Sequence, residues 1–333
     1  MSTMTLKDIA DQLGLSVTTV SRALSGQGRV KKETSERVMQ LARENHYTVN
    51  SLARSLRLSD TRSIGVVVPD ISNSFFAAVI KGAEEICHEN DYMLIVCNSD
   101  ENAKYEEEAL RTLLEKQISG LIIASVGGCP GILSKYSSQS LPVVYIDNEP
   151  SGAGEYDLVS IDNFSAASRL TEAILAHGYD RIGMITGPHG QSSAEMRYMG
   201  FRHAMNKAGV EIRDEWVSQG EFTLEAGFNS MKKILALKER PRAMLFANNM
   251  LAYGAVKAIK EAGLSIPGDM AAASFDAYDP TGLFSPQIAS LNQPAVEIGK
   301  RACEMIVEKL MDINIQNGRH VFLEPFYADG NSW

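Results

Sequence analysis

From residue 64 onward the chain alternates short apolar runs with amphipathic helical patterns, and this alternation restricts the fold more than any other feature. The apolar runs that we predict as strands cover residues 64–68, 92–97, 121–124, 143–146, 158–161, 182–185, 243–247 and 271–275. The helical patterns cover residues 76–89, 105–116, 166–177, 196–208, 251–262 and 296–311. Continuous apolar strands separated by helices indicate parallel sheets that are covered on both faces. About 270 residues of this pattern are more than a single hydrophobic core usually accommodates, so we expect two doubly wound α/β subdomains.

Polar and aromatic side chains follow several of these predicted strands, where ligands bind in doubly wound folds. The candidates for an effector site are Asp70, Phe75, Asp147, Ser193, Arg197, Phe222, Asn248 and Asp276. Asp and Asn side chains accept hydrogen bonds from hydroxyl groups, Arg donates in a fork, and an aromatic face covers the apolar face of a sugar ring. The set therefore suits a polyol. Any single strand-end acid can instead cap a helix, and Asp70 is the clearest such case.

Composition places the chain among ordinary globular proteins. Of its 333 residues, 44% are hydrophobic and 22% are charged. No apolar stretch approaches the roughly 18 residues of a membrane span, and the first eleven residues lack the apolar core of a signal peptide, so we expect a cytoplasmic protein. The four cysteines form no C-x-x-C pair, and we expect neither a metal site nor a cofactor.

Charge is divided unevenly along the chain. Residues 1–62 contain ten basic and six acidic side chains, a net charge of +4. Because the whole chain has a net charge of −9, the remaining residues have a net charge of −13. A basic head on an acidic body indicates a head that meets phosphate groups and a body that stays in solution.

The basic head contains the pattern of a helix-turn-helix. An apolar stripe from Leu6 to Leu13 ends at Gly14, and Ser16 is a natural N-cap for a second helix. The second helix presents Thr18, Thr19, Ser21 and Arg22 opposite its apolar stripe, and a third helix at about 32–45 closes the small core. This geometry can place the second helix in a major groove. A three-helix module that binds a protein is the alternative, which the positive charge disfavours.

Three segments of the head carry a resemblance to a known family. TLKDIA at 5–10, GLSVTTVSRAL at 14–24 and YTVNSLARSL at 47–56 resemble the DNA-binding head of the lactose repressor family, although Val49 replaces the usual proline. The resemblance implies a helix-turn-helix domain at 1–48 and a hinge helix and linker at 49–62. The DNA-contacting residues that it implies are Thr5, Ser16, Val17, Thr18, Thr19, Ser21, Arg22, Arg29, Asn50, Ala53, Arg54, Leu56 and Arg57. In this hypothesis Leu56 wedges between base pairs in the minor groove.

The body is similar to the effector-binding domain of the same family, which resembles periplasmic sugar-binding proteins. VPDISNSFF at 68–76, RYMGF at 197–201 and IPGD at 266–269 carry this similarity. It implies an effector-binding and dimerisation domain at 63–333. Its N-subdomain would span about 63–161 plus 291–320, and its C-subdomain about 162–290 plus 321–333. The family's usual acids are replaced by Asn249 and Ala277, which leaves open a less hydroxylated or an anionic ligand.

Together these features predict a DNA-binding transcriptional regulator, a repressor of a carbohydrate-utilisation operon that responds to a sugar or sugar derivative in a cleft between two subdomains. One short recognition helix reads few base pairs, so we expect a homodimer on a pseudo-palindromic operator. The chain has no leucine heptad after its last strand, which favours a dimer over a tetramer. The absence of P-loop, G-x-S-x-G and H-E-x-x-H motifs argues against an enzyme. The alternatives are a regulator that requires a nucleobase corepressor, a solute-binding protein, and a module that also binds a protein partner.

Overall fold

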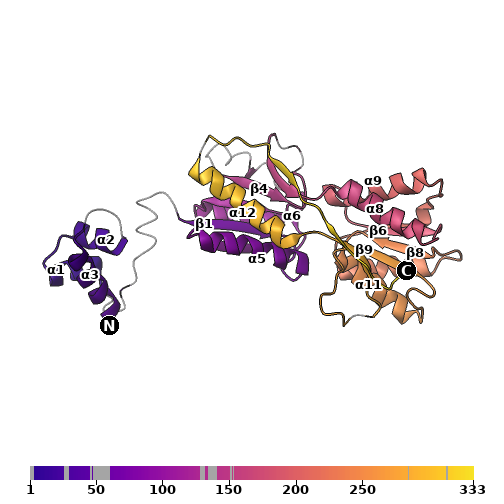
Figure 1. The fold of residues 1–333 in the computed structure, drawn as a ribbon, viewed down its shortest axis with the longest axis horizontal. Coiled ribbons are helices and arrows are strands. Elements are labelled where there is room, and N and C mark those ends of the chain that lie inside the picture. The colour runs from indigo at the N-terminus through magenta and orange to yellow at the C-terminus, as the bar shows by residue number, and fades with distance from the viewer. Residues whose placement is uncertain are drawn as a thin grey trace. The chain divides into compact units, whose positions relative to one another are not determined.

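The computed structural model describes residues 4–25, 30–45, 47, 61–127, 132–133, 141–150, 152, 154–283, 285–312 and 314–333. The chain divides into two compact units, a head at Met1–Thr61 and a body at Arg62–Trp333. Each unit has its own hydrophobic core, and Figure 1 shows the helices and strands of both.

The head is a bundle of three helices, α1 (Leu6–Leu13), α2 (Val17–Ser25) and α3 (Lys32–Glu44). Their core is built from small and branched residues, among them Ile9, Val20 and Val38, none of which is exposed to solvent. Gly14 ends α1 in the left-handed region at φ +65°, where glycine has no Cβ to strain the backbone. The helix, glycine turn and helix predicted from the sequence are therefore confirmed.

Two six-stranded sheets form the framework of the body. The first has the order β11-β5-β4-β3-β1-β2 and is parallel throughout, and the second has the order β12-β10-β9-β8-β6-β7 and is parallel except for β12. The strands of the first sheet are β1 (Ser63–Val68), β2 (Met93–Asn98), β3 (Gly120–Ile123), β4 (Val143–Ile146), β5 (Asp157–Ser160) and β11 (His320–Phe322). Those of the second sheet are β6 (Ile182–Thr186), β7 (Val217–Gln219), β8 (Ala243–Phe246), β9 (Ala271–Phe275), β10 (Ala289–Asn292) and β12 (Phe326–Ala328).

Helices cover both faces of each sheet, as the continuous apolar strands predicted. The first sheet carries α5 (Ser74–Glu89) and α12 (Ala295–Met311) on one face and α6 (Ala103–Glu115) on the other. The second carries the pair α8 (Asn163–Ala176) and α9 (Ser192–Lys207) and the pair α10 (Leu224–Leu235) and α11 (Asn249–Glu261), with a short 3-10 helix at Asp214–Trp216. Figure 1 shows α5 and α12 side by side. A Cβ at Gly82 would lie 2.0 Å from the Val296 carbonyl oxygen, so glycine permits this close approach.

The chain passes between the two sheets three times, after β5, after β10 and after β11. The second segment of the N-subdomain was expected at about 291–320, and in the structure both of its ends lie about two residues later. Leu291 pairs with Phe275 in the second sheet, and Phe322 pairs with Ser160 in the first, so each crossing comes after these residues. The sequence patterns missed α10, β7, β10, β11 and β12, and these four strands have only three or four residues each. Among the described residues, no helix is both long and apolar enough to cross a lipid bilayer.

Candidate functional site

The predicted DNA-reading side chains of the head lie on one outward face of α2. Ser16, Thr18 and Arg22 are exposed, and Thr19 and Ser21 are partly buried. Val17 is 47% exposed, which is unusual for a branched apolar residue in so small a bundle. A helix in a major groove distinguishes base pairs through hydroxyl groups, a guanidinium and an apolar contact with the thymine methyl. The arrangement therefore suits a recognition helix.

Two residues that we predicted as DNA contacts also hold the helices. Thr5 caps α1, because its Oγ1 accepts from the Asp8 amide at 3.3 Å and donates to Asp8 Oδ2 at 2.7 Å. These hydrogen bonds hold the pKa of Asp8 below its usual value. Ser16 Oγ accepts from the Thr19 amide at 3.1 Å at the start of α2, as its N-cap prediction requires. Contact of either residue with DNA stays a prediction.

The remaining predictions for the head lie outside the described residues. They concern Arg29 and the hinge residues Asn50, Ala53, Arg54, Leu56 and Arg57. The expected hinge helix and linker at 49–62 fall largely in the same part of the chain, of which only residues 61 and 62 are described.

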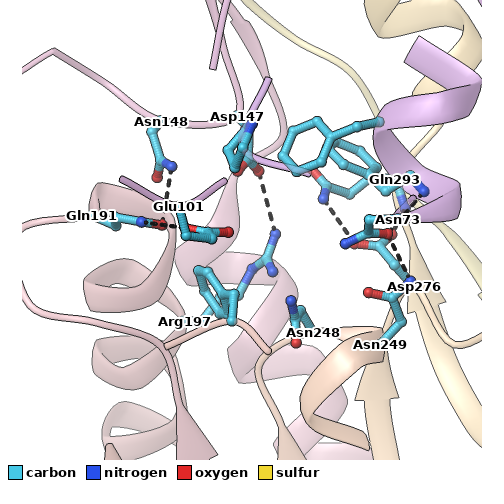
Figure 2. Close-up of a pocket in the computed structure, with 14 residues that line it drawn as sticks. Asn73, Glu101, Asp147, Asn148, Gln191, Arg197, Asn248, Asn249, Asp276 and Gln293 are labelled. Carbon is cyan, nitrogen blue, oxygen red and sulfur yellow. Dashed lines mark hydrogen bonds and ion pairs between the residues drawn. The ribbon is translucent and has the colours of Figure 1, made fainter. Parts of the chain in front are cut away.

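In the body, a cavity that is partly open to solvent lies between the two sheets at the carboxyl ends of their strands. Six of the eight predicted effector residues line it, namely Phe75, Asp147, Arg197, Phe222, Asn248 and Asp276. Figure 2 shows the labelled polar side chains converging on this space from both subdomains. The ring of Phe222 packs against Gly187, where a Cβ would lie only 2.2 Å from the ring. Glycine at this position therefore leaves room for the ring. The structure brings these six residues together, and their contact with a ligand stays a prediction.

Arg197 occupies the floor of this cavity and is only 2% exposed. Its Nε donates to Asn163 Oδ1 at 2.8 Å and its Nη1 to the Ala247 carbonyl at 2.5 Å, while the guanidinium carbon lies 4.2 Å from the centre of the Phe275 ring. Its Nη2 lies 3.8 Å from Asp147 Oδ1 and has no hydrogen-bond partner. The side chain is thus held in place while the two N–H groups of Nη2 remain available to a ligand.

Two carboxylates of the cavity lie within the electrostatic reach of this guanidinium. Asp147 follows β4 and Asp276 follows β9, and both have positive φ values, of 61° and 55°. Asp276 accepts from the backbone amide and from Nε2 of Gln293, each at 2.8 Å. Burial raises the pKa of Asp147 and of Asp276, and the positive charge of Arg197 opposes this rise. Such side chains favour a ligand that donates hydrogen bonds.

The other two predicted effector residues do not line the cavity. Asp70 Oδ1 accepts from the amide and the hydroxyl of Ser72, at 2.8 and 2.6 Å, so this acid shapes the turn before α5. Ser193 donates from both its amide and its hydroxyl to Asn148 Oδ1, at 3.0 and 2.7 Å. Both side chains thus have partners within the protein, and their contact with a ligand stays a prediction.

The sequence analysis missed several polar residues of the cavity, namely Asn73, Glu101, Asn148, Gln191, Asn249 and Gln293. Asn148 and Asn249 directly follow predicted site residues, so their position after a strand was an available signal. Glu101 gave no such signal, because it lies in the loop between β2 and α6. Burial and the charge of Asp147, opposed by a hydrogen bond from Gln191, raise the pKa of Glu101 to about 7. The cavity thus contains a third acid, which weighs against the anionic ligand left open above.

Side chains join the two subdomains on both sides of the cavity. On one side Asn249 Nδ2 of α11 donates to Asn73 Oδ1 at the start of α5 at 2.9 Å. On the other side Gln191 Nε2 donates to Glu101 Oε2 at 3.2 Å, and Asn148 accepts from Ser193. The subdomains are therefore held together around the cavity by side-chain hydrogen bonds rather than by a continuous apolar core, an arrangement that a ligand can stabilise.

Comparison with known proteins covers nearly the whole chain. The family of periplasmic binding proteins and sugar binding domains of the LacI family matches residues 61–323, and bacterial regulatory proteins of the lacI family match residues 5–50. The HTH-type transcriptional repressor PurR of Pasteurella multocida is 33% identical over 307 residues, which cover 92% of both chains. The ribose operon repressor of Haemophilus influenzae is 32% identical over 326 residues, which cover 96% of both chains.

A solved structure agrees with these sequence comparisons. The crystal structure of a LacI family transcriptional regulator from Silicibacter pomeroyi is similar over 99% of both chains, with a TM-score of 0.83 and 27% identity. The two family matches agree with the exposed polar residues of α2 in the head and with the cavity in the body. The chain belongs to the lacI family of bacterial regulatory proteins, whose members are DNA-binding transcriptional regulators.

Proposed function

We propose that this protein is a cytoplasmic repressor whose affinity for operator DNA is set by a sugar or sugar-like polyol bound in the cavity of the body. One observation carries the choice of ligand. Among the described residues, two buried side-chain atoms have no hydrogen-bond partner, Arg197 Nη2 and Gln293 Oε1, and both residues line the cavity. A buried polar atom without a partner is costly, so both atoms favour a polar ligand.

The two atoms require opposite partners, which narrows the ligand chemistry. Arg197 Nη2 can only donate, and Gln293 Oε1 can only accept. A hydroxyl group both donates and accepts, so vicinal hydroxyls of a polyol can satisfy both atoms and Asp147 and Asp276 as well. The buried rings of Phe75 and Phe76, with Phe222, supply apolar surface for the C–H face of a sugar ring.

The head supports an operator of two half-sites. Ser16 and α2 offer six predicted readers, from Ser16 to Arg22, which can contact only a few base pairs. A homodimer doubles this contact and requires a pseudo-palindrome. The ribose operon repressor of Haemophilus influenzae aligns with 96% of this chain and is 32% identical to it. This similarity supports the proposal that the protein represses a carbohydrate operon. We propose no enzymatic activity, since the cavity residues above account for binding alone.

The experiment has two stages and uses the full chain. A thermal-shift screen against free pentoses, hexoses and nucleobases first identifies a ligand, because a ligand at 100 times its Kd adds about 2.7 kcal/mol of stability. Operator affinity is then measured at fixed salt with and without that ligand. A sugar that changes operator affinity supports the proposal. A nucleobase that does so would replace the sugar by a nucleobase corepressor, and a ligand without effect on DNA binding would indicate a solute-binding protein.

A further inference from the structure

Acids outnumber bases around the effector cavity. The charged side chains among the described residues that line it are Glu101, Asp147, Arg197 and Asp276. Arg197 is the single cation, and its Nε and Nη1 are already committed to Asn163 and to the Ala247 carbonyl. An incoming anion would therefore find the two N–H groups of Arg197 Nη2 and three carboxyl groups. Like charges brought together in a site of low dielectric repel strongly.

Glu101 gives the cavity this excess of acid. It stands on the loop between β2 and α6 with φ +52°, and its Oε2 is fixed by Gln191 of the other subdomain at 3.2 Å. Figure 2 shows its carboxyl group beside Gln191, at the edge of the space that Asp147 and Arg197 face. The negative charges of Asp147, Glu221 and Asp70 act on Glu101 and disfavour its ionised form.

At each helix N-terminus of the cavity, one backbone amide is already bonded to a side chain of the protein. Helices α5, α9 and α11 begin at the cavity, and free amides at such termini commonly bind phosphate. Here an asparagine side chain accepts from one amide at each terminus. Asn73 accepts from the Phe75 amide at 3.1 Å, Asn148 from the Ser193 amide at 3.0 Å, and Asn248 from the Leu251 amide at 2.9 Å. These donors are used within the protein.

From this arrangement we propose that the cavity takes an uncharged sugar and rejects its phosphorylated and carboxylated forms, with Glu101 as a specificity-determining residue. The inference rests on the proposed polyol effector and narrows it. A phosphate group offers mainly acceptor oxygens, so it could satisfy Arg197 Nη2 but not Gln293 Oε1, and it would repel Asp147 and Asp276. The several hydroxyls of a neutral sugar can satisfy these groups without adding charge.

The test compares matched sugar pairs on the full chain by titration calorimetry at pH 7.5 and constant ionic strength. The pairs are D-ribose with D-ribose 5-phosphate, D-glucose with D-glucose 6-phosphate, and D-galactose with D-galacturonate. We expect any free sugar that binds to do so at least about 100-fold more tightly than its charged partner, because like-charge contact costs several kcal/mol. Equal or tighter binding of a charged sugar would overturn the inference while leaving the polyol site in place. Binding of no sugar at all, free or charged, would reject the proposed effector and this inference with it.

Variants assign the selectivity to Glu101. Glu101→Gln keeps the side-chain length and an oxygen that can accept from Gln191, so it removes charge with little change of shape. In Glu101→Gln, the ratio of the affinity for the free sugar to the affinity for the charged sugar should fall about tenfold, since one of three acids is lost. Glu221→Gln is the matched control, because Glu221 is an exposed acid near Glu101 that does not line the cavity. An unchanged ratio in Glu101→Gln, or equal narrowing in both variants, would refute the role of Glu101.

Discussion

The head and the body of this protein place their predicted binding residues in opposite surroundings. In the head, Val17, Thr18 and Arg22 stand exposed on a single helix of nine residues. In the body, the cavity residues come from segments between Pro69 and Gln293, and most of them are buried. Exposed side chains can change without disturbing the fold, whereas buried polar groups serve both the fold and the ligand. Substitutions should therefore separate binding from stability in the head and couple them in the body.

The largest effect should follow from Arg197→Ala, which removes the only cation of the described cavity lining. Asp147 would lose its charged neighbour at 3.8 Å, and Asn163 Oδ1 and the Ala247 carbonyl would lose their donors. We expect effector binding to fall at least about 100-fold and the body to lose roughly 2–4 kcal/mol of stability. Calorimetry and urea unfolding measure the two effects.

A matched arginine variant makes the comparison specific. Arg169 forms an exposed ion pair with Glu324 at 2.6 Å and lies outside the cavity, so Arg169→Ala should change stability by less than about 1 kcal/mol and leave effector binding intact. Operator binding by Arg197→Ala should persist without effector if the ligand is an inducer. A normal effector response in Arg197→Ala would show that the cavity is not the effector site.

In the head, Arg22→Ala should change DNA binding and leave stability nearly unchanged. Arg22 is exposed on α2, where a contact with a base edge is worth about 1–3 kcal/mol. Specific operator binding should therefore weaken more than binding to random DNA at the same salt concentration. Arg43→Ala, an exposed arginine on α3, is the control. Equal losses on operator and random DNA would identify Arg22 as a phosphate contact instead.

The difference between the two regions also explains what the sequence could predict. The three head helices agree with the structure because their signals are local, as Leu6 to Leu13 with Gly14 and Ser16 illustrate. The strands that end at Asp147, Asn248 and Asp276 were also predicted, because a buried parallel strand is a continuous apolar run. Polar residues directly after such runs could therefore be assigned to the cavity.

The remaining cavity residues depend on contacts that no local pattern contains. Glu101 enters the cavity only because its loop meets Gln191, 90 residues away, across the two subdomains. Gln293 lies at the second crossing of the chain, directly after β10, a strand of four residues that the patterns missed. Asp70 shows the reverse limit, since its place after β1 predicted a ligand contact, whereas in the structure its Oδ1 accepts from Ser72 and it does not line the cavity.

A smaller effect, dependent on pH, should distinguish Glu101 from an ordinary surface acid. Burial raises its pKa from 4.5 to about 7, so the native state holds the Glu101 proton more tightly than the unfolded state does. Native stability from this group is therefore greatest at low pH and is lost as pH rises between 4.5 and 7. Relative to wild type, Glu101→Gln should gain roughly 1–2 kcal/mol on going from pH 5 to pH 8. Parallel pH profiles of unfolding for the two proteins would contradict this assignment.

The smallest effect we expect is in the head, where Thr5 tests whether a predicted DNA contact can also be structural. Thr5 Oγ1 exchanges hydrogen bonds with Asp8 at the start of α1, and the Thr5 amide donates to Asp8 Oδ2 at 2.8 Å. Removing a capping hydroxyl typically costs about 1 kcal/mol, so Thr5→Ala should lower head stability by that amount, whereas Thr5→Ser should restore most of it. Hydrogen exchange of the α1 amides in the full chain measures the loss without interference from the body. If Thr5→Ala weakens operator binding while α1 amide protection stays at the wild-type level, Thr5 contacts DNA directly. If binding and protection fall together and both recover in Thr5→Ser, the capping role explains the effect, and even an exposed residue of the head couples fold and binding.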